Sequence, residues 1–116
     1  MKKFMAVYTG TPTGRAEWER LSAEERNSRM AAGMRAWQEW GATHRKAIVD
    51  GGGPLGKTKS VSKQGISDTR NNLAAYVIVQ AESHEDAARL FENHPHFSIF
   101  PGDGVEIMEC LPVPGQ

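Results

Sequence analysis

The densest group of chemically capable side chains in the sequence is Asn93-His94-Pro95-His96-Phe97. An imidazole titrates near neutral pH and can serve as a general acid, a general base or a metal ligand. A histidine near the end of a helix also has a structural use, because it interacts favourably with the helix dipole and can cap free carbonyls. At the level of sequence, both a functional and a structural interpretation of His94 and His96 stay open.

Asp68 and two aromatic side chains could complete a reactive site with these histidines. Asp68 lies in a polar stretch before an apolar strand, where its carboxylate could orient a histidine or receive its proton. An aspartate there could equally hydrogen-bond the backbone of a turn. We predict Asp68 as general base or orienting carboxylate, and His94 or His96 as proton donor. Trp37 and Tyr76 are predicted to form pocket walls, although Trp37 also suits a core position.

A metal centre would require at least a third ligand beside the histidine pair. The candidates are His44, Asp50, Asp68 and Glu106, which are far apart in the sequence and show no ligand spacing. We therefore expect neither a metal nor another cofactor. Cys110 falls in the expected last strand, and we expect it to be a small buried core residue.

The run Gly51-Gly52-Gly53-Pro54-Leu55-Gly56-Lys57-Thr58 matches the phosphate-loop pattern G-x-x-x-x-G-K-T. A phosphate loop holds its ligand with backbone amides at the start of a helix. The residues that follow, 59–65, show no helical apolar face, and no later strand ends in the acidic residue that would hold magnesium. We predict a strand-connecting turn at 51–56 that binds no nucleotide.

Length and charge limit the classes of protein that this chain could represent. Its 116 residues predict a single domain over 1–116. The 14 basic and 14 acidic residues disfavour a nucleic-acid binder or a polybasic membrane binder, and the longest strongly apolar run, 73–79, is far shorter than a membrane helix. A single cysteine and the absence of a signal-peptide core predict a cytoplasmic protein.

The elements that must position these side chains follow from hydrophobic periodicity and from helix-capping residues. Ser22 and Glu25 form a capping box that starts a helix, which we expect to end at Gly41. Ser83 starts a second helix, which Pro95 ends; His94 shares its apolar face with Phe91, so we expect a buried ring. We expect polar loops at 68–72 and strands at 3–9, 46–49, 58–63, 73–80 and 105–111.

The order strand, helix, strands, helix, strand predicts an α+β fold. It is a ferredoxin-like split βαβ subunit with an antiparallel sheet and both helices on one face. The strands 73–80 and 105–111 are apolar on both faces, and two helices can cover only one of them. We therefore predict a homodimer in which a second copy covers the other face.

Several ordered motifs between Met5 and Pro112 are similar to those of the YCII-related family, also called DGPF-domain proteins. Asp68-Thr69-Arg70-Asn71 stands where the family has its D-G-P-F run, and Glu106 stands at the glutamate of its final strand. The other matching segments are Gly52-Gly53-Pro54-Leu55, Leu73 to Val79, Ser83 to Ala88, Asn93 to Phe97 and Gly104 to Ile107.

The resemblance implies a dimeric α+β barrel of ferredoxin-like subunits with a small-molecule pocket between sheet and helices. It also places Glu106 among the substrate-binding candidates. For function it implies a metal-independent enzyme of the proton-transfer or lyase type. A non-catalytic dimeric module that senses a ligand or binds a regulator is the first alternative. A monooxygenase-like enzyme, as in other dimeric α+β barrels, is a further one.

Overall fold

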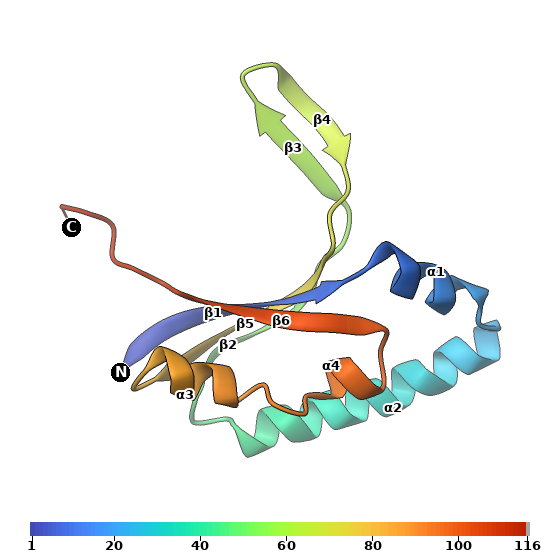
Figure 1. Ribbon diagram of the computed structural model, residues 1–116, viewed down its shortest axis with the longest axis horizontal. Helices are drawn as coiled ribbons and strands as arrows, with labels where there is room; N and C mark the ends of the chain where they lie inside the picture. The colour runs from blue at the N-terminus through green and yellow to red at the C-terminus, as the bar shows by residue number, and fades with distance from the viewer. Residues whose placement is uncertain (116) are drawn as a thin grey trace.

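The computed structural model describes residues 1–115, and a four-stranded sheet forms its centre (Figure 1). The capping box predicted at Ser22 and Glu25 starts the long helix, and the hydroxyl of Ser83 caps the third. The elements in chain order are β1 (Lys2–Gly10), α1 (Pro12–Arg20), α2 (Ala23–Thr43), β2 (Ile48–Pro54), β3 (Thr58–Ser62), β4 (Gly65–Thr69), β5 (Leu73–Ala81), α3 (His84–Arg89), α4 (Pro95–Ser98) and β6 (Gly102–Glu109).

The four strands of the central sheet run in the order β2-β5-β1-β6, and each neighbouring pair is antiparallel. Helices α2, α3 and α4 lie on one side of this sheet (Figure 1). This is the ferredoxin-like arrangement that the sequence predicts, with two additions. Helix α1 precedes α2, and the separate hairpin β3-β4 stands off on the other side of the sheet.

The core lies between the sheet and the helices. Alternate residues of β1, namely Phe4, Ala6 and Tyr8, are fully buried there, opposite Val79 and Val77 of β5. Trp37 and Trp40 of α2 pack against this cluster, and the indole nitrogen of Trp40 donates to the carbonyl of Leu90 at 2.9 Å. The period-two alternation therefore aims one set of side chains at the helices and leaves the other set on the open face.

Three expectations about local structure prove wrong, and each has a physical reason. Helix α2 continues past Gly41 to Thr43, because one glycine in a helix costs only about 1 kcal/mol and the Trp40 contact anchors the last turn. Asp68 lies in strand β4 instead of a loop, since it pairs across the hairpin with Lys59. Cys110, expected in the core, is exposed because it follows the end of β6.

The second predicted helix is interrupted before it reaches His94. Helix α3 ends at Arg89, and Asn93 adopts a left-handed conformation with φ of 58°. His94 is then the N-cap of α4, and Pro95 begins that helix. Proline is well suited to a first helical position, because its missing N–H would have no partner there. His94 is buried, as predicted, but not on the face of the second helix.

The glycine run that resembles a phosphate loop is a bulged edge strand followed by a hairpin. Residues 51–54 belong to β2, whereas the sequence predicts a turn there, and the register against β5 shifts between Asp50 and Gly53. At Gly52 the backbone has φ of 61°, and a Cβ would overlap the carbonyl of Tyr76. Thr58 then opens strand β3, so the helix that a phosphate loop requires is not formed.

Among residues 1–115, no helix has both the length and the apolar character needed to cross a membrane.

Candidate functional site

His94 has no exposed surface, and both of its ring nitrogens are engaged within the fold. Its Nδ1 accepts the backbone N–H of His96 at 3.0 Å and so carries a lone pair. In the neutral ring the proton is therefore on Nε2, which donates to the hydroxyl of Tyr8 at 3.1 Å. Burial, with smaller contributions from His96 and His44, lowers the pKa of His94 to about 4. His94 is thus a neutral internal residue that caps α4.

Tyr8 forms the centre of an aromatic cluster between the sheet and helix α2. Its ring lies 4.6 Å from Trp37, 5.0 Å from His94 and 5.2 Å from His96, measured between centroids. Burial raises the pKa of the Tyr8 hydroxyl, so this group stays protonated. The cluster holds both histidines in fixed orientations, but only one of them reaches a cavity.

His96, which is 5% exposed and lines that cavity, has one ring nitrogen without a protein partner. Its Nε2 lies 2.8 Å from the carbonyl oxygen of Thr9, which can only accept, so Nε2 carries the proton. Nδ1 then carries the lone pair and has no protein partner in the described chain. No buried side-chain nitrogen within 1–115 lacks a partner, so Nδ1 must be accessible to solvent. The neutral form of the imidazole is therefore held with its proton on Nε2 and its basic lone pair on Nδ1.

Gly102 makes the position of His96 possible. A Cβ on Gly102 would overlap both the carbonyl oxygen and the ring of His96. A second glycine has the same role for another lining residue, because a Cβ on Gly33 of α2 would overlap the ring of Phe100. The two glycines therefore fix side chains of His96 and Phe100 that line the cavity.

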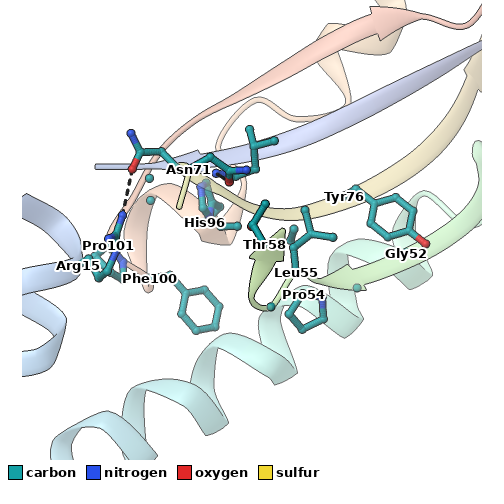
Figure 2. A pocket seen from close by; sticks show the side chains of 18 of the residues that line it. Arg15, Gly52, Pro54, Leu55, Thr58, Asn71, Tyr76, His96, Phe100 and Pro101 are labelled. Atoms are coloured by element: carbon teal, nitrogen blue, oxygen red, sulfur yellow. Dashed lines mark hydrogen bonds between the residues drawn. The ribbon is translucent and has the colours of Figure 1, made fainter. Parts of the chain in front are cut away.

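The cavity is an open cleft of about 1340 Å³ at the end of the sheet. Helices α1 and α2 border it on one side, and the base of the β3-β4 hairpin borders it on the other. Figure 2 shows Arg15, His96 and Phe100 across from Leu55 and Thr58, with α2 running along the floor of the view. The cleft extends around the end of the sheet. It is not confined to the layer between the sheet and the helices, where the resemblance implies a pocket.

This cavity brings together four of the six residues predicted for the site: Asp68, His96, Trp37 and Tyr76. The other two lie elsewhere. His94 is enclosed behind Tyr8, and Glu106 is exposed on the open face of the sheet, where its register partner is Val7.

Asp68 lines the cavity, and its carboxylate forms an ion pair with Lys59. Its carboxylate lies 2.6 Å from the ammonium of Lys59, its cross-strand neighbour, and both side chains are largely exposed, at 85% and 69%. An exposed ion pair of this kind contributes little to stability. The two groups the sequence offers as an acid–base pair, Asp68 and His94, therefore do not share a pocket, whereas Asp68 and His96 do.

The sequence reasoning missed the remaining cationic residues of the cavity, Arg15, Lys57 and Arg70. Arg15 is oriented by a 3.0 Å hydrogen bond to Asn72, and Lys57 and Arg70 flank the first pair of the hairpin. Nothing in their spacing reveals a site, because they come from α1 and from both ends of the hairpin. One feature of the sequence could have indicated Lys57. It lies in the run that matches a phosphate loop, where a positive side chain follows several glycines.

In the part of the chain that the structure describes, no group of three or more histidine, cysteine, aspartate or glutamate side chains lies close enough to hold a metal ion.

Comparison with known proteins supports the fold. None of the known family models matches the chain, and no curated protein matches its sequence. A solved structure of 5-chloro-2-hydroxyhydroquinone dehydrochlorinase from Burkholderia phenoliruptrix AC1100, in complex with 2,5-dihydroxybenzoquinone, is similar to it, with a TM-score of 0.50 and 17% identity. The likeness covers 90% of this chain and 89% of the dehydrochlorinase. At this identity it supports the α+β fold with an antiparallel sheet.

Proposed function

We propose that the protein binds a small organic molecule in the cleft at the end of the sheet and exchanges a proton with it through Nδ1 of His96. One observation carries this proposal: His96 lines the cleft in a tautomer fixed by the Thr9 carbonyl, with its remaining nitrogen free. A general base needs such a lone pair within hydrogen-bond reach of the proton that it takes. The reaction class is proton transfer or elimination, without a metal.

Two further observations support this assignment. Trp37 and Phe100 supply apolar walls, which is typical of small-molecule sites. The dehydrochlorinase with a similar fold was solved with a bound quinone, so this fold can accommodate a small organic ring. Together with the ordered motifs, the shared fold also supports the proposal that the chain belongs to the YCII-related family.

The binding step can be tested with a small-molecule library and thermal unfolding, because a ligand that binds only the native state raises the melting temperature. We expect at least one organic compound to raise it in the wild type, with a smaller effect in His96→Gln. Glutamine can still donate to the Thr9 carbonyl, so this variant keeps the packing and loses the base. A library in which nothing shifts the melting temperature at millimolar concentration would contradict the proposal.

The proton-transfer step has a separate readout, since a base that removes a proton from carbon returns one from solvent. For a bound compound that carries an acidic C–H bond, we expect NMR in D2O to show deuterium entering the ligand with wild type and not with His96→Gln. Binding without such exchange or any elimination product would favour the non-catalytic ligand-sensing module instead. That alternative already has one observation in its favour, the neutralised charge of Asp68.

We also propose that the protein acts as a homodimer. On the open face of the sheet, Met5 lies between Ile78 and Met108 on the neighbouring strands, and Met5 and Met108 are 37% and 44% exposed. The accessible surface of the chain is 8301 Å², whereas a compact monomer of 12.8 kDa would expose about 6300 Å². The excess is comparable with the surface that one subunit buries in a large dimer interface.

A further inference from the structure

The cleft at the end of the sheet carries more positive charge than the chain around it. Its charged lining residues are Arg15, Lys57, Lys59, Arg70 and one acid, Asp68. Over the whole sequence, basic and acidic residues balance at 14 each. The positive charge is therefore local to the cleft and is not a property of the surface in general.

Most of this charge is not neutralised by the protein. Asp68 pairs with Lys59, and the only other ion pair among residues 1–115 joins Arg89 to Glu85, away from the cleft. Arg15, Lys57 and Arg70 thus line the cleft without a carboxylate partner in the described chain. Cations that converge on one concave surface attract an anionic ligand and raise its local concentration.

The cations at the base of the hairpin and the aromatic side chains on α2 occupy different parts of the cleft. Lys57 and Arg70 flank the base of the hairpin, whereas Trp37 belongs to α2 and Phe100 rests on Gly33 of the same helix. The rings of Trp37 and Phe100 are 6.0 Å apart with an interplanar angle of 65°, an edge-to-face pair on which a further aromatic ring can pack. Figure 2 shows Phe100 beside the helix, with Arg15 on the same side of the cleft and with Leu55 and Thr58 across from them.

We infer that the ligand of this cleft is a planar aromatic anion, such as a carboxylate or a phenolate, with its ring against Trp37 and Phe100 and its charged group toward Lys57 and Arg70. This inference rests on the proposed function and specifies its substrate class. It also gives His96 a reacting partner, because His96 and Phe100 line the same cleft.

Calorimetry with matched probes tests the charge and the ring separately. The probes are 4-hydroxybenzoate, its uncharged amide 4-hydroxybenzamide, and cyclohexanecarboxylate, which keeps the charge without the aromatic ring. We expect 4-hydroxybenzoate to bind at least about tenfold more tightly than either of the others, which corresponds to about 1.4 kcal/mol. Its affinity should fall as salt is raised, because the cations are open to solvent.

Two variants and a control place the anion in the cleft. Lys57→Gln and Arg70→Gln should each weaken 4-hydroxybenzoate several-fold and leave 4-hydroxybenzamide unchanged. Lys63→Gln removes the same charge from the exposed tip of the hairpin, outside the cleft, and should have no effect. All three positions are exposed, so each variant should fold.

The outcomes separate this inference from the proposed function. Equal affinity for the acid and the amide, or unchanged binding in Lys57→Gln and Arg70→Gln, would overturn the anionic class while leaving a small-molecule site in place. Binding of cyclohexanecarboxylate as tight as that of 4-hydroxybenzoate would overturn the aromatic class. No binding of 4-hydroxybenzoate at millimolar concentration would overturn the inference, whereas the proposed function is decided by the thermal-shift library.

Discussion

His94 and His96 are two residues apart and have opposite roles in this structure. The first has both nitrogens committed, to the Tyr8 hydroxyl and to the backbone N–H of His96. The second donates from one nitrogen to the Thr9 carbonyl, has no protein partner for the other, and lines the cleft. The difference follows from their places on α4, because His94 is the N-cap of this helix and His96 lies within its first turn.

The low pKa of His94 predicts that the fold loses stability in mild acid. The folded-state pKa is about 4 against an ordinary value of 6.5, so below pH 6.5 the unfolded chain binds a proton that the folded chain does not. The free energy of unfolding should therefore fall by up to about 3 kcal/mol as the pH drops from 6.5 to 4. Urea denaturation at several pH values measures it.

A His94→Gln variant provides the control for this pH dependence. Glutamine can donate to Tyr8 but does not titrate, so the variant should be less stable at pH 7 and show a much shallower decline toward pH 4. An equally steep decline in the variant would mean that other groups cause the acid sensitivity.

The contact between Gly102 and His96 allows a substitution that displaces the candidate base without replacing it. In Gly102→Ala the new methyl group would overlap His96, break its hydrogen bond to Thr9 and reduce stability by roughly 1–3 kcal/mol. Ligand-induced thermal shifts should be lost as well. Gly104→Ala on the same strand is the matched control, since its Cβ would meet Thr9 Oγ1 at an ordinary 3.5 Å. Similar ligand-induced shifts in both variants would argue against His96.

Helix α2 supports the cleft through a notch at Gly33, the one residue of this helix that is buried. The ring of Phe100 occupies the space that a side chain would fill, so the chain after α4 packs closely on the helix. The same helix offers Trp37 to the core cluster and to the cleft. An amphipathic pattern at Met30, Gly33, Met34 and Trp37 therefore serves the cleft as much as the core, since both methionines line it and remain about half exposed.

Two glycines of α2 should respond in opposite ways to alanine. In a helix interior, alanine is favoured over glycine by about 1 kcal/mol. Gly41→Ala should gain up to this amount, because its Cβ would meet nothing closer than Ile48 at 4.0 Å. Gly33→Ala should instead lose about 1 kcal/mol or more, since overpacking against Phe100 outweighs the gain in propensity. Denaturation midpoints of the two variants test this. Stabilisation of both would contradict the close packing of Phe100 on Gly33.

The whole chain is extended for its length. Its radius of gyration is 16.0 Å, whereas a compact domain of 116 residues has about 13 Å. The hairpin β3-β4 accounts for part of this, because it pairs only with itself, and Val61 and Ile66, which face each other across it, are 76% and 73% exposed. An isolated hairpin is marginally stable in water. A second copy on the open face would give both the sheet and the hairpin a partner.

Light scattering or sedimentation equilibrium tests the proposed homodimer. We expect a dimer at micromolar concentration and a shift toward monomer in Met108→Glu, because a buried carboxylate without a partner is costly. Met30→Glu is the control, since Met30 is 45% exposed, close to the 44% of Met108, but lies on the helical side. A wild-type monomer, or equal dissociation of both variants, would contradict the interface on the open face.

The sequence alone determined the main strands of the central sheet, the starts of α2 and α3, and the layers that they form. Alternation in 73–80 and the caps at Ser22 and Ser83 depend on interactions between neighbours in the chain, and these are visible in the residues. Tertiary structure decided what depends on distant contacts. It showed that Gly41 does not end α2, because Trp40 is anchored to Leu90, and that the glycine run is a strand bulge against Tyr76.

The site divides in the same way. Residue types single out His94, His96 and Asp68 as the groups able to do chemistry. His94 is buried as predicted, but as the N-cap of α4 and not on the helical face that the pattern indicated. Only the fold assigns the tautomers, because Thr9 and Tyr8 lie on β1, more than 80 residues away in sequence. Only the fold collects Arg15, Lys57 and Arg70 around one cleft. Charges and hydrogen bonds act through space. The spacing of residues along one chain therefore does not indicate which distant residues come into contact.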